Sequence, residues 1–425
     1  MFDLIRQRLT NKQVLVLGFG REGKSTLRFL EKYVPDAFVA VADRNEAALE
    51  EPRQKGLPVF SGDHYLEVIN HYDVVIKTPG IALFNVEVAE NVDITSQTDL
   101  FLSEFHRQTI GITGTKGKST TTSLIYHLLK SSGRDAILTG NIGIPCFDIM
   151  EQIHGDSIVV YELSAHQLEY VHNSPSVGVL LNVFEEHLDH FGSFERYKRA
   201  KFNLLRFMDG DDFAVVHDSL MGETLELGVN NVLFSMMEFD IDEDALPLLG
   251  AHNLLNVKAA LCACGVYGVD PEGLIPYLYT FRPLEHRLEP VGAFGGVTFV
   301  NDSISTIPQA AISACEALGR VDFLLLGGFD RGIDYVPLAD YIQRHPVAHL
   351  LFTGKAGERM MVLMQERGVQ GAMQPYPDME TAFRYIKLHA RSGDVCLLSP
   401  AASSYDQYKN FEERGAKFKR LAREF

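Results

Sequence analysis

Short runs of β-branched and other apolar residues alternate with longer amphipathic stretches along the whole chain. Such alternation is typical of repeated strand–helix units, and it predicts an α/β fold with a largely parallel sheet in each domain. Strands are expected at 14–17, 38–42, 109–112, 158–161, 177–183, 297–300, 323–326, 349–352 and 395–398. Helices are expected in the stretch that ends at Tyr33, in 121–130 and in 197–207. No internal repeat and no low-complexity linker interrupts the pattern.

The expected strands fall into three sets, which predict three domains over 1–97, 98–282 and 283–425. The length of 425 residues agrees with this division, because roughly 150 residues per domain suggests two or three domains. Hydrophobic residues make up 46% of the chain and charged residues 22%, so each domain has enough apolar material for a packed core.

The formal charge of −17 argues against a general nucleic-acid binder, which needs a net basic surface. No apolar run approaches the roughly 20 residues that span a bilayer, and the first residues contain no signal-peptide core, so we expect a cytoplasmic protein without a membrane partner. The cysteines are odd in number and scattered, so we interpret them as reduced packing residues: Cys146, Cys262, Cys264, Cys315 and Cys396.

The most informative motif is Gly-Ile-Thr-Gly-Thr-Lys-Gly-Lys-Ser-Thr at 111–120, between an expected strand and an expected helix. Its backbone N–H groups and the helix N-terminus would cradle the phosphates of ATP, with Lys118 at the β- and γ-oxygens and Ser119 on Mg²⁺. The motif departs from a strict Walker A pattern because Ile112 stands where that pattern has glycine. A Gly-rich turn without a ligand is the simpler alternative.

A second glycine motif, Gly-Phe-Gly-Arg-Glu-Gly at 18–23, follows the first expected strand and opens a helix. Asp43 lies twenty residues after Gly23, at the end of the next strand. Taken literally, this is a dinucleotide fingerprint, so a nicotinamide dehydrogenase is the competitor from another class. That hypothesis leaves the phosphate loop and the last domain without a role, whereas the same loop could instead hold the diphosphate of UDP.

The form Thr-Gly-Thr-x-Gly-Lys-Ser-Thr resembles the Mur ligase and folylpolyglutamate synthetase superfamily. Further segments are similar to those of the D-glutamate-adding branch of the Mur ligases, in the same order: 140–145, 162–169, 182–190, 252–256, 284–289, 301–303 and 399–415. The resemblance implies a Rossmann-like N-terminal domain, a central P-loop ATPase domain with a mostly parallel sheet and a C-terminal Rossmann-like α/β domain.

The resemblance also implies roles for individual residues. Catalytic residues would be Lys118, His187, Lys201 and Arg287. ATP would be bound by Gly114, Thr115, Lys116, Gly117, Lys118, Ser119, Thr120, Asn253, Asn256, Arg287 and Asp302. Magnesium, expected as two ions, would be held by Ser119, Glu162, His187 and a carbamylated Lys201. The UDP-linked substrate would contact Gly18, Phe19, Gly20, Arg21, Asp43, Arg44 and Asn141. The amino acid would contact Thr306, Arg331, Ser404 and Phe411.

The expected reaction adds D-glutamate to UDP-N-acetylmuramoyl-L-alanine in peptidoglycan precursor synthesis, and we expect the enzyme to be a monomer. ATP converts the carboxylate into an acyl phosphate, which the amine attacks, so the products are ADP, phosphate and the amide. The alternatives are folylpolyglutamate synthetase, sister ligases for L-alanine, a diamino acid or a dipeptide, and a non-catalytic nucleotide-binding module. The Asp-Asn-Pro-Arg motif of the diamino-acid ligases is absent.

One position departs from the family pattern. Many D-glutamate ligases have Asn-Asp-Ser-Lys-Ala-Thr-Asn, whereas this chain has Asn-Asp-Ser-Ile-Ser-Thr-Ile at 301–307. Ile304 therefore stands where a lysine is expected to pair with a substrate carboxylate. A buried carboxylate without a partner would cost several kcal/mol, so another cation must replace the lysine. Arg331 matches a second family cation and can bind a carboxylate bidentately.

Overall fold

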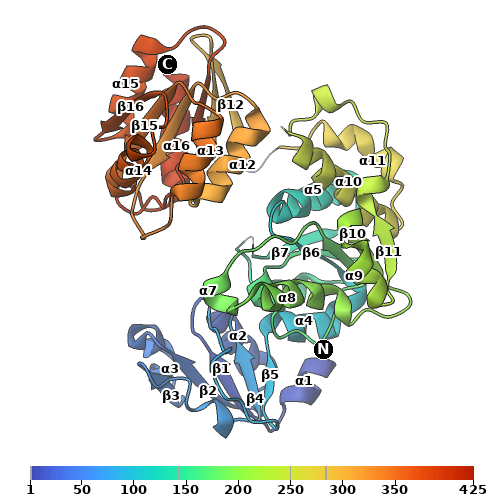
Figure 1. Ribbon diagram of the computed structural model, residues 1–425. Coiled ribbons are helices and arrows are strands. Elements are labelled where there is room, and N and C mark those ends of the chain that lie inside the picture. Colours follow the sequence, from blue (N-terminus) through green and yellow to red (C-terminus); the bar gives the residue numbers. More distant parts are fainter. Residues whose placement is uncertain (1, 142, 249, 283–284) are drawn as a thin grey trace. The chain divides into compact units, whose positions relative to one another are not determined.

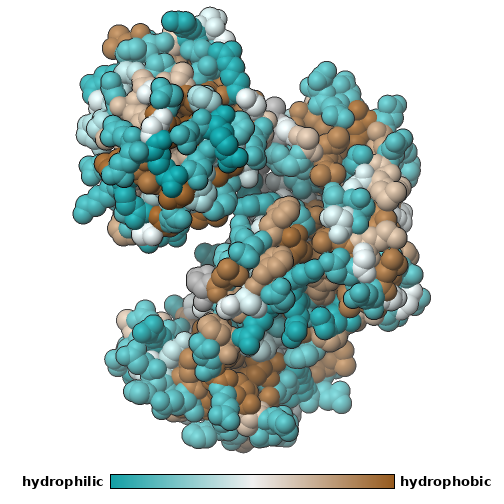
Figure 2. Space-filling view, in the orientation of Figure 1, coloured by the Kyte–Doolittle hydropathy of each residue, from teal (hydrophilic) through white to brown (hydrophobic). Residues whose placement is uncertain are grey.

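The computed structural model describes residues 2–141, 143–248, 250–282 and 285–425 (Figure 1). They form two compact units. The first contains residues up to 245 together with 254–281, and the second contains 246–253 and 282–425. In the described ranges, no helix is long and apolar enough to cross a membrane. Figure 2 shows polar side chains mixed with apolar ones over the visible face of both units.

The first sheet lies in residues 13–95 and is entirely parallel, with the strand order β3-β2-β1-β4-β5. Its strands are β1 (Gln13–Leu17), β2 (Phe38–Asp43), β3 (Val59–Ser61), β4 (Val74–Lys77) and β5 (Asp93–Thr95). The helices of this region are α1 (Asp3–Leu9), α2 (Arg21–Tyr33), η1 (Glu46–Leu49), α3 (Glu50–Gln54), η2 (Ile69–His71) and α4 (Gln97–Phe105).

The second sheet, in residues 109–233, is also parallel, with the order β11-β10-β9-β6-β8-β7. Its strands are β6 (Thr109–Thr113), β7 (Ala136–Gly140), β8 (Ile158–Glu162), β9 (Val177–Leu180), β10 (Phe213–Val216) and β11 (Asn230–Leu233). The α-helices are α5 (Lys118–Ser131), α6 (Ala165–Leu168), α7 (Leu188–Phe191), α8 (Phe194–Arg206), α9 (Met221–Glu226), α10 (Ala251–Val266) and α11 (Pro271–Leu278). Shorter turns are η3 (His106–Gln108), η4 (Cys146–Gln152), η5 (Asp218–Leu220), η6 (Phe234–Met236) and η7 (Glu243–Ala245).

The third sheet belongs to the second unit and has the order β12-β13-β17-β14-β15-β16. Only the edge pair β12–β13 is antiparallel. Its strands are β12 (Glu289–Phe294), β13 (Val297–Asn301), β14 (Phe323–Gly327), β15 (His349–Thr353), β16 (Ala372–Tyr376) and β17 (Val395–Leu398). The helices are α12 (Pro308–Leu318), α13 (Val336–Arg344), α14 (Gly354–Glu366), α15 (Met379–His389) and α16 (Phe411–Arg423).

Successive residues of the central strands enter different cores, so both faces of the sheets are covered. In β14, Leu324 and Leu326 pack in one hydrophobic cluster, whereas Phe323 and Leu325 pack in another. Strands buried on both faces consist of nearly continuous apolar residues, which is the pattern that predicted them. The structure confirms a mixed α/β fold with parallel sheets. The five cysteines are all buried and form no disulfide within the described chain.

One expected strand was too long. The structure ends β9 at Leu180, whereas the apolar run had predicted a strand through 183. After Leu180, the N–H of Leu181 still donates to Thr113 of β6, whereas Asn182 bonds Thr115 and Lys116 of the phosphate loop. The three-domain division at 97 and 282 stays a prediction.

Candidate active site

The phosphate loop connects the end of β6 to the first turn of α5. Gly117 forms the N-cap of α5 at φ +86°, a left-handed conformation that favours glycine. A Cβ atom at this position would also lie 2.4 Å from Asn256 Oδ1, so any side chain would displace that asparagine. Gly117 therefore allows the loop to turn directly into the N-terminus of α5, and a helix N-terminus of this kind can bind phosphate.

Asn182, at the end of the strand beside β6, holds the loop in place. Its carbonyl accepts from the N–H of Thr115 at 2.9 Å, and its side-chain amide bonds both backbone groups of Lys116, at 2.8 and 3.1 Å. The Thr115 hydroxyl lies 3.0 Å from the Tyr197 hydroxyl of α8. These contacts fix the loop to the end of β9 and to α8.

Two lysines meet at the same loop carbonyl. The ammonium of Lys118 donates to the carbonyls of Gly114 and Thr115 at 2.8 and 3.1 Å, and that of Lys201 donates to Gly114 at 2.7 Å. The Lys201 side chain is buried and lies 4.8 Å from the ring centre of Tyr197. Burial, and next the Lys118 charge, lower the pKa of Lys201 well below its ordinary value, against a smaller opposite effect of Glu186. The amine of Lys201 is thus disposed to be neutral.

Glu162 ends β8 and pairs in register with Ile112 of β6, so it lies on the same sheet edge as the loop. Its side chain is buried. Oε1 accepts from the amide of Asn141 at 3.0 Å, whereas Oε2 is buried and has no hydrogen-bond partner within the described residues. A buried carboxylate oxygen in that condition is costly, and a hard cation such as Mg²⁺ would satisfy it. The residues present therefore fit a magnesium site.

His187 is placed near this edge by an unusual backbone. It lies at φ +56°, outside the conformations that most residues adopt, and forms the N-cap of α7. Its half-exposed ring lies 4.8 Å from the ring of His166, and Nε2 lies 3.8 Å from Glu186. Backbone strain of this kind is concentrated at functional sites.

The Gly-rich loop of the first sheet is closely packed and held by Asp43. The N–H groups of Phe19 and Asn45 donate to the two carboxylate oxygens of Asp43, at 2.6 and 2.7 Å. Arg21 donates to the carbonyl of Gly143 at 2.8 Å. The structure thus assigns Asp43 a positioning contact. Arg44 lies at the surface in an exposed ion pair with Asp63.

In the second unit, Arg287 and Asp302 lie close together. Asp302 is buried and accepts from the N–H of Leu288 at 3.1 Å and from the hydroxyl of Ser399 at 2.7 Å. Burial raises the pKa of Asp302 to about 6, although its hydrogen bonds and the Arg287 guanidinium oppose this shift. Asn253, of the second unit, and Asn256, of the first, are both buried and lie one turn apart on α10.

Of the residues expected around the amino acid, Thr306 and Arg331 are in direct contact. Arg331 donates to the carbonyl of Thr306 at 3.3 Å. Ser404 is buried, and the carbonyl of Phe411 accepts from the Ser303 hydroxyl at 2.8 Å. The sequence analysis did not single out Arg414, whose buried guanidinium bonds Ser303 at 2.9 and 3.0 Å and the carbonyl of Ala402 at 3.0 Å.

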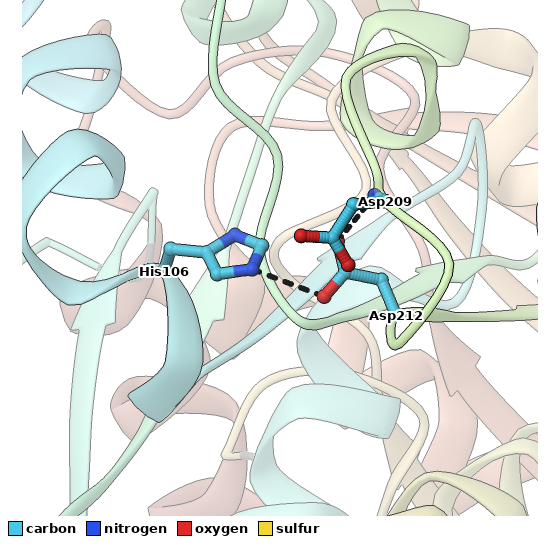
Figure 3. A group of neighbouring side chains, drawn as sticks. All are labelled: His106, Asp209 and Asp212. Atoms are coloured by element: carbon cyan, nitrogen blue, oxygen red, sulfur yellow. Dashed lines mark hydrogen bonds and ion pairs between the residues drawn. The ribbon is translucent and has the colours of Figure 1, made fainter.

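A separate group of possible metal ligands lies at the opposite edge of the second sheet (Figure 3). His106 precedes β6, and Asp209 and Asp212 precede β10, so all three lie at the amino ends of parallel strands. The imidazole bonds the Ser174 carbonyl through Nδ1 at 2.6 Å and lies 3.0 Å from Asp212 through Nε2. We interpret this group as a hydrogen-bonded contact between two loops, because each imidazole nitrogen already has a protein partner.

A phosphate loop at the carboxyl edge of a parallel sheet, with a buried carboxylate and two lysines beside it, defines an enzyme that uses ATP. The family model for the Mur ligase middle domain matches residues 112–245, and that for the Mur ligase, glutamate ligase domain matches 286–402. The chain belongs to the Mur ligase family and is an ATP-dependent, amide-forming ligase. This excludes the dehydrogenase interpretation of the first glycine motif.

Relatives that match over nearly the whole chain support this family assignment. The UDP-N-acetylmuramoylalanine–D-glutamate ligase of Symbiobacterium thermophilum is 32% identical over 448 residues and covers 96% of this chain and 97% of its own. The enzyme of the same name from Bacillus subtilis is 33% identical over 447 residues and covers 97% of both chains. Among solved structures, a MurF ligase from Thermotoga maritima in complex with ADP has a TM-score of 0.59 at 18% identity, covering 100% of both chains.

Proposed function

We propose that this enzyme, as a cytoplasmic monomer, adds D-glutamate to UDP-N-acetylmuramoyl-L-alanine in peptidoglycan precursor synthesis. The observation that carries the proposal is the pair of relatives of that name, which are 32–33% identical over nearly the whole chain. The sheet-edge chemistry supports it, because amide formation from a carboxylate requires ATP, and the phosphate loop with Lys118 and the buried Lys201 beside it suits phosphoryl transfer.

In the proposed mechanism, a carboxylate oxygen of the UDP-linked substrate attacks the γ-phosphorus of ATP, and ADP leaves. The amine of D-glutamate then attacks the acyl phosphate, loses a proton and expels phosphate. Lys118, released from the Gly114 and Thr115 carbonyls, neutralises charge on the transferring phosphoryl group, with Arg287 as a second cation. Magnesium, when bound by Ser119, Glu162, His187 and a carbamylated Lys201, would supply further positive charge at the phosphates.

We further propose a division of labour among the three predicted domains. Residues 1–97 bind the UDP part through the loop at 18–21, together with Asn141 of the central domain, whose amide already contacts Glu162. Residues 98–282 bind ATP, aided by Asn253 and Asn256. Residues 283–425 bind the amino acid around Thr306, Arg331, Ser404 and Phe411.

Phosphate release by the purified enzyme tests the proposed function. With ATP, Mg²⁺ and UDP-N-acetylmuramoyl-L-alanine, we expect release to depend on D-glutamate and to exceed release with L-glutamate, L-alanine, L-lysine or meso-diaminopimelate. The reason is that a cation on the amino-acid side selects a second carboxylate of defined position. A clear preference for any of the other four amino acids would overturn the assignment.

Arg331 is the cation that we expect to replace the missing lysine at position 304. Its guanidinium lies at the surface, 3.3 Å from the Thr306 carbonyl, so it is accessible to a ligand beside that threonine. Arg331→Ala should raise the KM for D-glutamate about 10-fold to 100-fold, because a charge-assisted, bidentate pair is lost. The KM for ATP should stay unchanged.

Arg320→Ala is the matched control. Arg320 is an exposed arginine of the same unit, paired with Asp322 and Asp394 at the other end of the strands, and its loss should leave all three Michaelis constants unchanged. If Arg331→Ala behaves like this control, a different group holds the substrate carboxylate.

A further inference from the structure

A buried charge lies between the first two sheets. Lys77 is the last residue of β4, and its side chain is only 2% exposed. Its ammonium lies 3.1 Å from Glu169 Oε2 and 5.2 Å from the ring centre of Tyr170. Burial lowers the pKa of Lys77, but Glu169 and Glu22 oppose this effect. Neither the phosphate loop nor the expected metal ligands contact this lysine in any hydrogen bond or ion pair described for its ammonium.

The two acidic partners come from different parts of the first unit. Glu22 lies in the first turn of α2, directly after the Gly-rich loop of the first sheet. Glu169 forms the C-cap of α6, a helix that begins three residues after Glu162. The same Glu169 oxygen lies 3.1 Å from His190, and Gln167 of α6 donates to Glu22 at 2.8 Å. A single cluster thus connects α2, β4 and α6.

Each side of the cluster adjoins a candidate ligand loop. Next to Lys77, Thr78 donates through both its N–H and its hydroxyl to the Leu17 carbonyl, at 2.9 and 3.0 Å, and packs against Gly18. On the other side, Gln167 completes a capping box with Ser164, two residues after Glu162. Lys77, Glu169 and Glu22 therefore connect the loop expected to hold the UDP group with the Glu162 segment expected to bind magnesium.

We infer that Lys77 is a positioning residue, which through Glu169 and Glu22 holds the UDP-binding loop of the first sheet in register with the Glu162 segment of the second. A substrate that spans both segments needs this register, so that its carboxylate meets the γ-phosphate while its diphosphate stays on the first loop. This inference rests on the proposed function, because it assumes a UDP-linked substrate that occupies both loops.

The described contacts that hold the phosphate loop involve none of the side chains of Lys77, Glu169 and Glu22. Its contacts with Asn182, Tyr197 and Lys201 come from the end of β9 and from α8. Loss of Lys77 should therefore disturb the UDP-linked substrate and leave ATP binding alone. If Lys77 served only to stabilise the fold, its loss would change the KM for the UDP-linked substrate and the KM for ATP to a similar extent.

Steady-state kinetics of Lys77→Met and Glu169→Gln test the inference. Both variants should raise the KM for UDP-N-acetylmuramoyl-L-alanine about 10-fold to 100-fold, since a substrate held out of register loses binding at one end. The KM for ATP should change by no more than about twofold. Lys55→Met is the control, because Lys55 forms surface ion pairs with Glu31 and Glu51 in the same region, and it should match the wild type.

The double variant Lys77→Met with Glu169→Gln distinguishes a positioning role of Lys77 from a general loss of stability. Removal of the lysine alone leaves a poorly solvated carboxylate, whereas the double variant removes both charges, so its thermal midpoint should recover while its KM for the UDP-linked substrate stays high. A normal KM in a folded Lys77→Met enzyme, or an equal rise in both Michaelis constants, would overturn the inference. If instead the wild type shows no turnover with this substrate, the proposed function fails.

Discussion

Replacement of Lys118 by alanine should abolish phosphate release while the enzyme still binds UDP-N-acetylmuramoyl-L-alanine. In the structure, the Lys118 ammonium is held by the carbonyls of Gly114 and Thr115, at the point where the phosphates of ATP are expected. Charge on the transferring phosphoryl group is stabilised almost entirely by such fixed cations. Loss of this one should lower kcat by about 10³-fold or more.

The Lys118→Ala variant should also keep its affinity for the UDP-linked substrate. Its proposed loop at 18–21 is built by β1, α2 and Asp43, none of which contacts the Lys118 ammonium in the hydrogen bonds described. Calorimetry should therefore give a dissociation constant within about twofold of the wild type.

Lys130→Ala is the control for Lys118→Ala. Lys130 lies in the last turn of the same helix, in a partly exposed pair with Asp135 at 3.7 Å, and its loss should leave turnover intact. A folded Lys118→Ala variant that no longer binds the UDP-linked substrate would show that the two sites are not separate.

The strands that the sequence predicted are short and largely apolar, because both of their faces are buried. The prediction missed β4 and β10, although their residues are apolar and mostly buried, and it also missed strands that lack this pattern. β5 is only three residues long, β12 contains Pro290 and Gly292, and β16 contains Pro375. Edge strands tolerate proline and glycine because one side of the ladder is not paired, and there the pairing depends on tertiary contacts rather than on local sequence.

The residues of the candidate site also differ in how well the sequence could predict them. The phosphate loop could be predicted because its chemistry requires glycine, lysine and a hydroxyl at fixed spacing. Arg414 could not, because its partner Ser303 lies 111 residues away in sequence, and an arginine on an amphipathic helix is usually exposed. The burial of Lys77 could not be predicted either, because it depends on the contact between the end of β4 and Glu169 at the end of α6.

Lys201 was predicted from the resemblance to the family rather than from its local sequence. The structure adds the physical condition that its proposed chemistry requires. Carbamate formation begins when a neutral amine attacks CO₂. A nitrogen–carbon bond forms and the nitrogen loses a proton, so that the neutral amine becomes an anionic carbamate. Burial of Lys201 and repulsion by Lys118 lower its pKa, which favours the neutral amine that this step requires.

We therefore expect Lys201→Ala to lower kcat about 10²-fold to 10³-fold, because an anionic ligand for Mg²⁺ is lost beside the phosphate loop. Added formate or acetate should restore part of this activity, since a short carboxylate can enter the space left by the side chain. Lys198→Ala is the control, because Lys198 lies on the same helix but pairs with Glu223 near the surface at 2.5 Å. It should match the wild type in activity and show no response to carboxylates.

Isotope-labelled bicarbonate gives a measurement that does not depend on turnover. By NMR, the wild type and Lys198→Ala should each show one carbamate signal, and Lys201→Ala should show none. We expect this selectivity because burial and the Lys118 charge lower the pKa of Lys201, which lies against the Gly114 carbonyl and the ring of Tyr197, whereas Lys198 is paired with Glu223 near the surface. Full activity of Lys201→Ala, or a carbamate signal that survives the substitution, would refute the carbamate and leave Lys201 as a buried donor that shapes the phosphate loop.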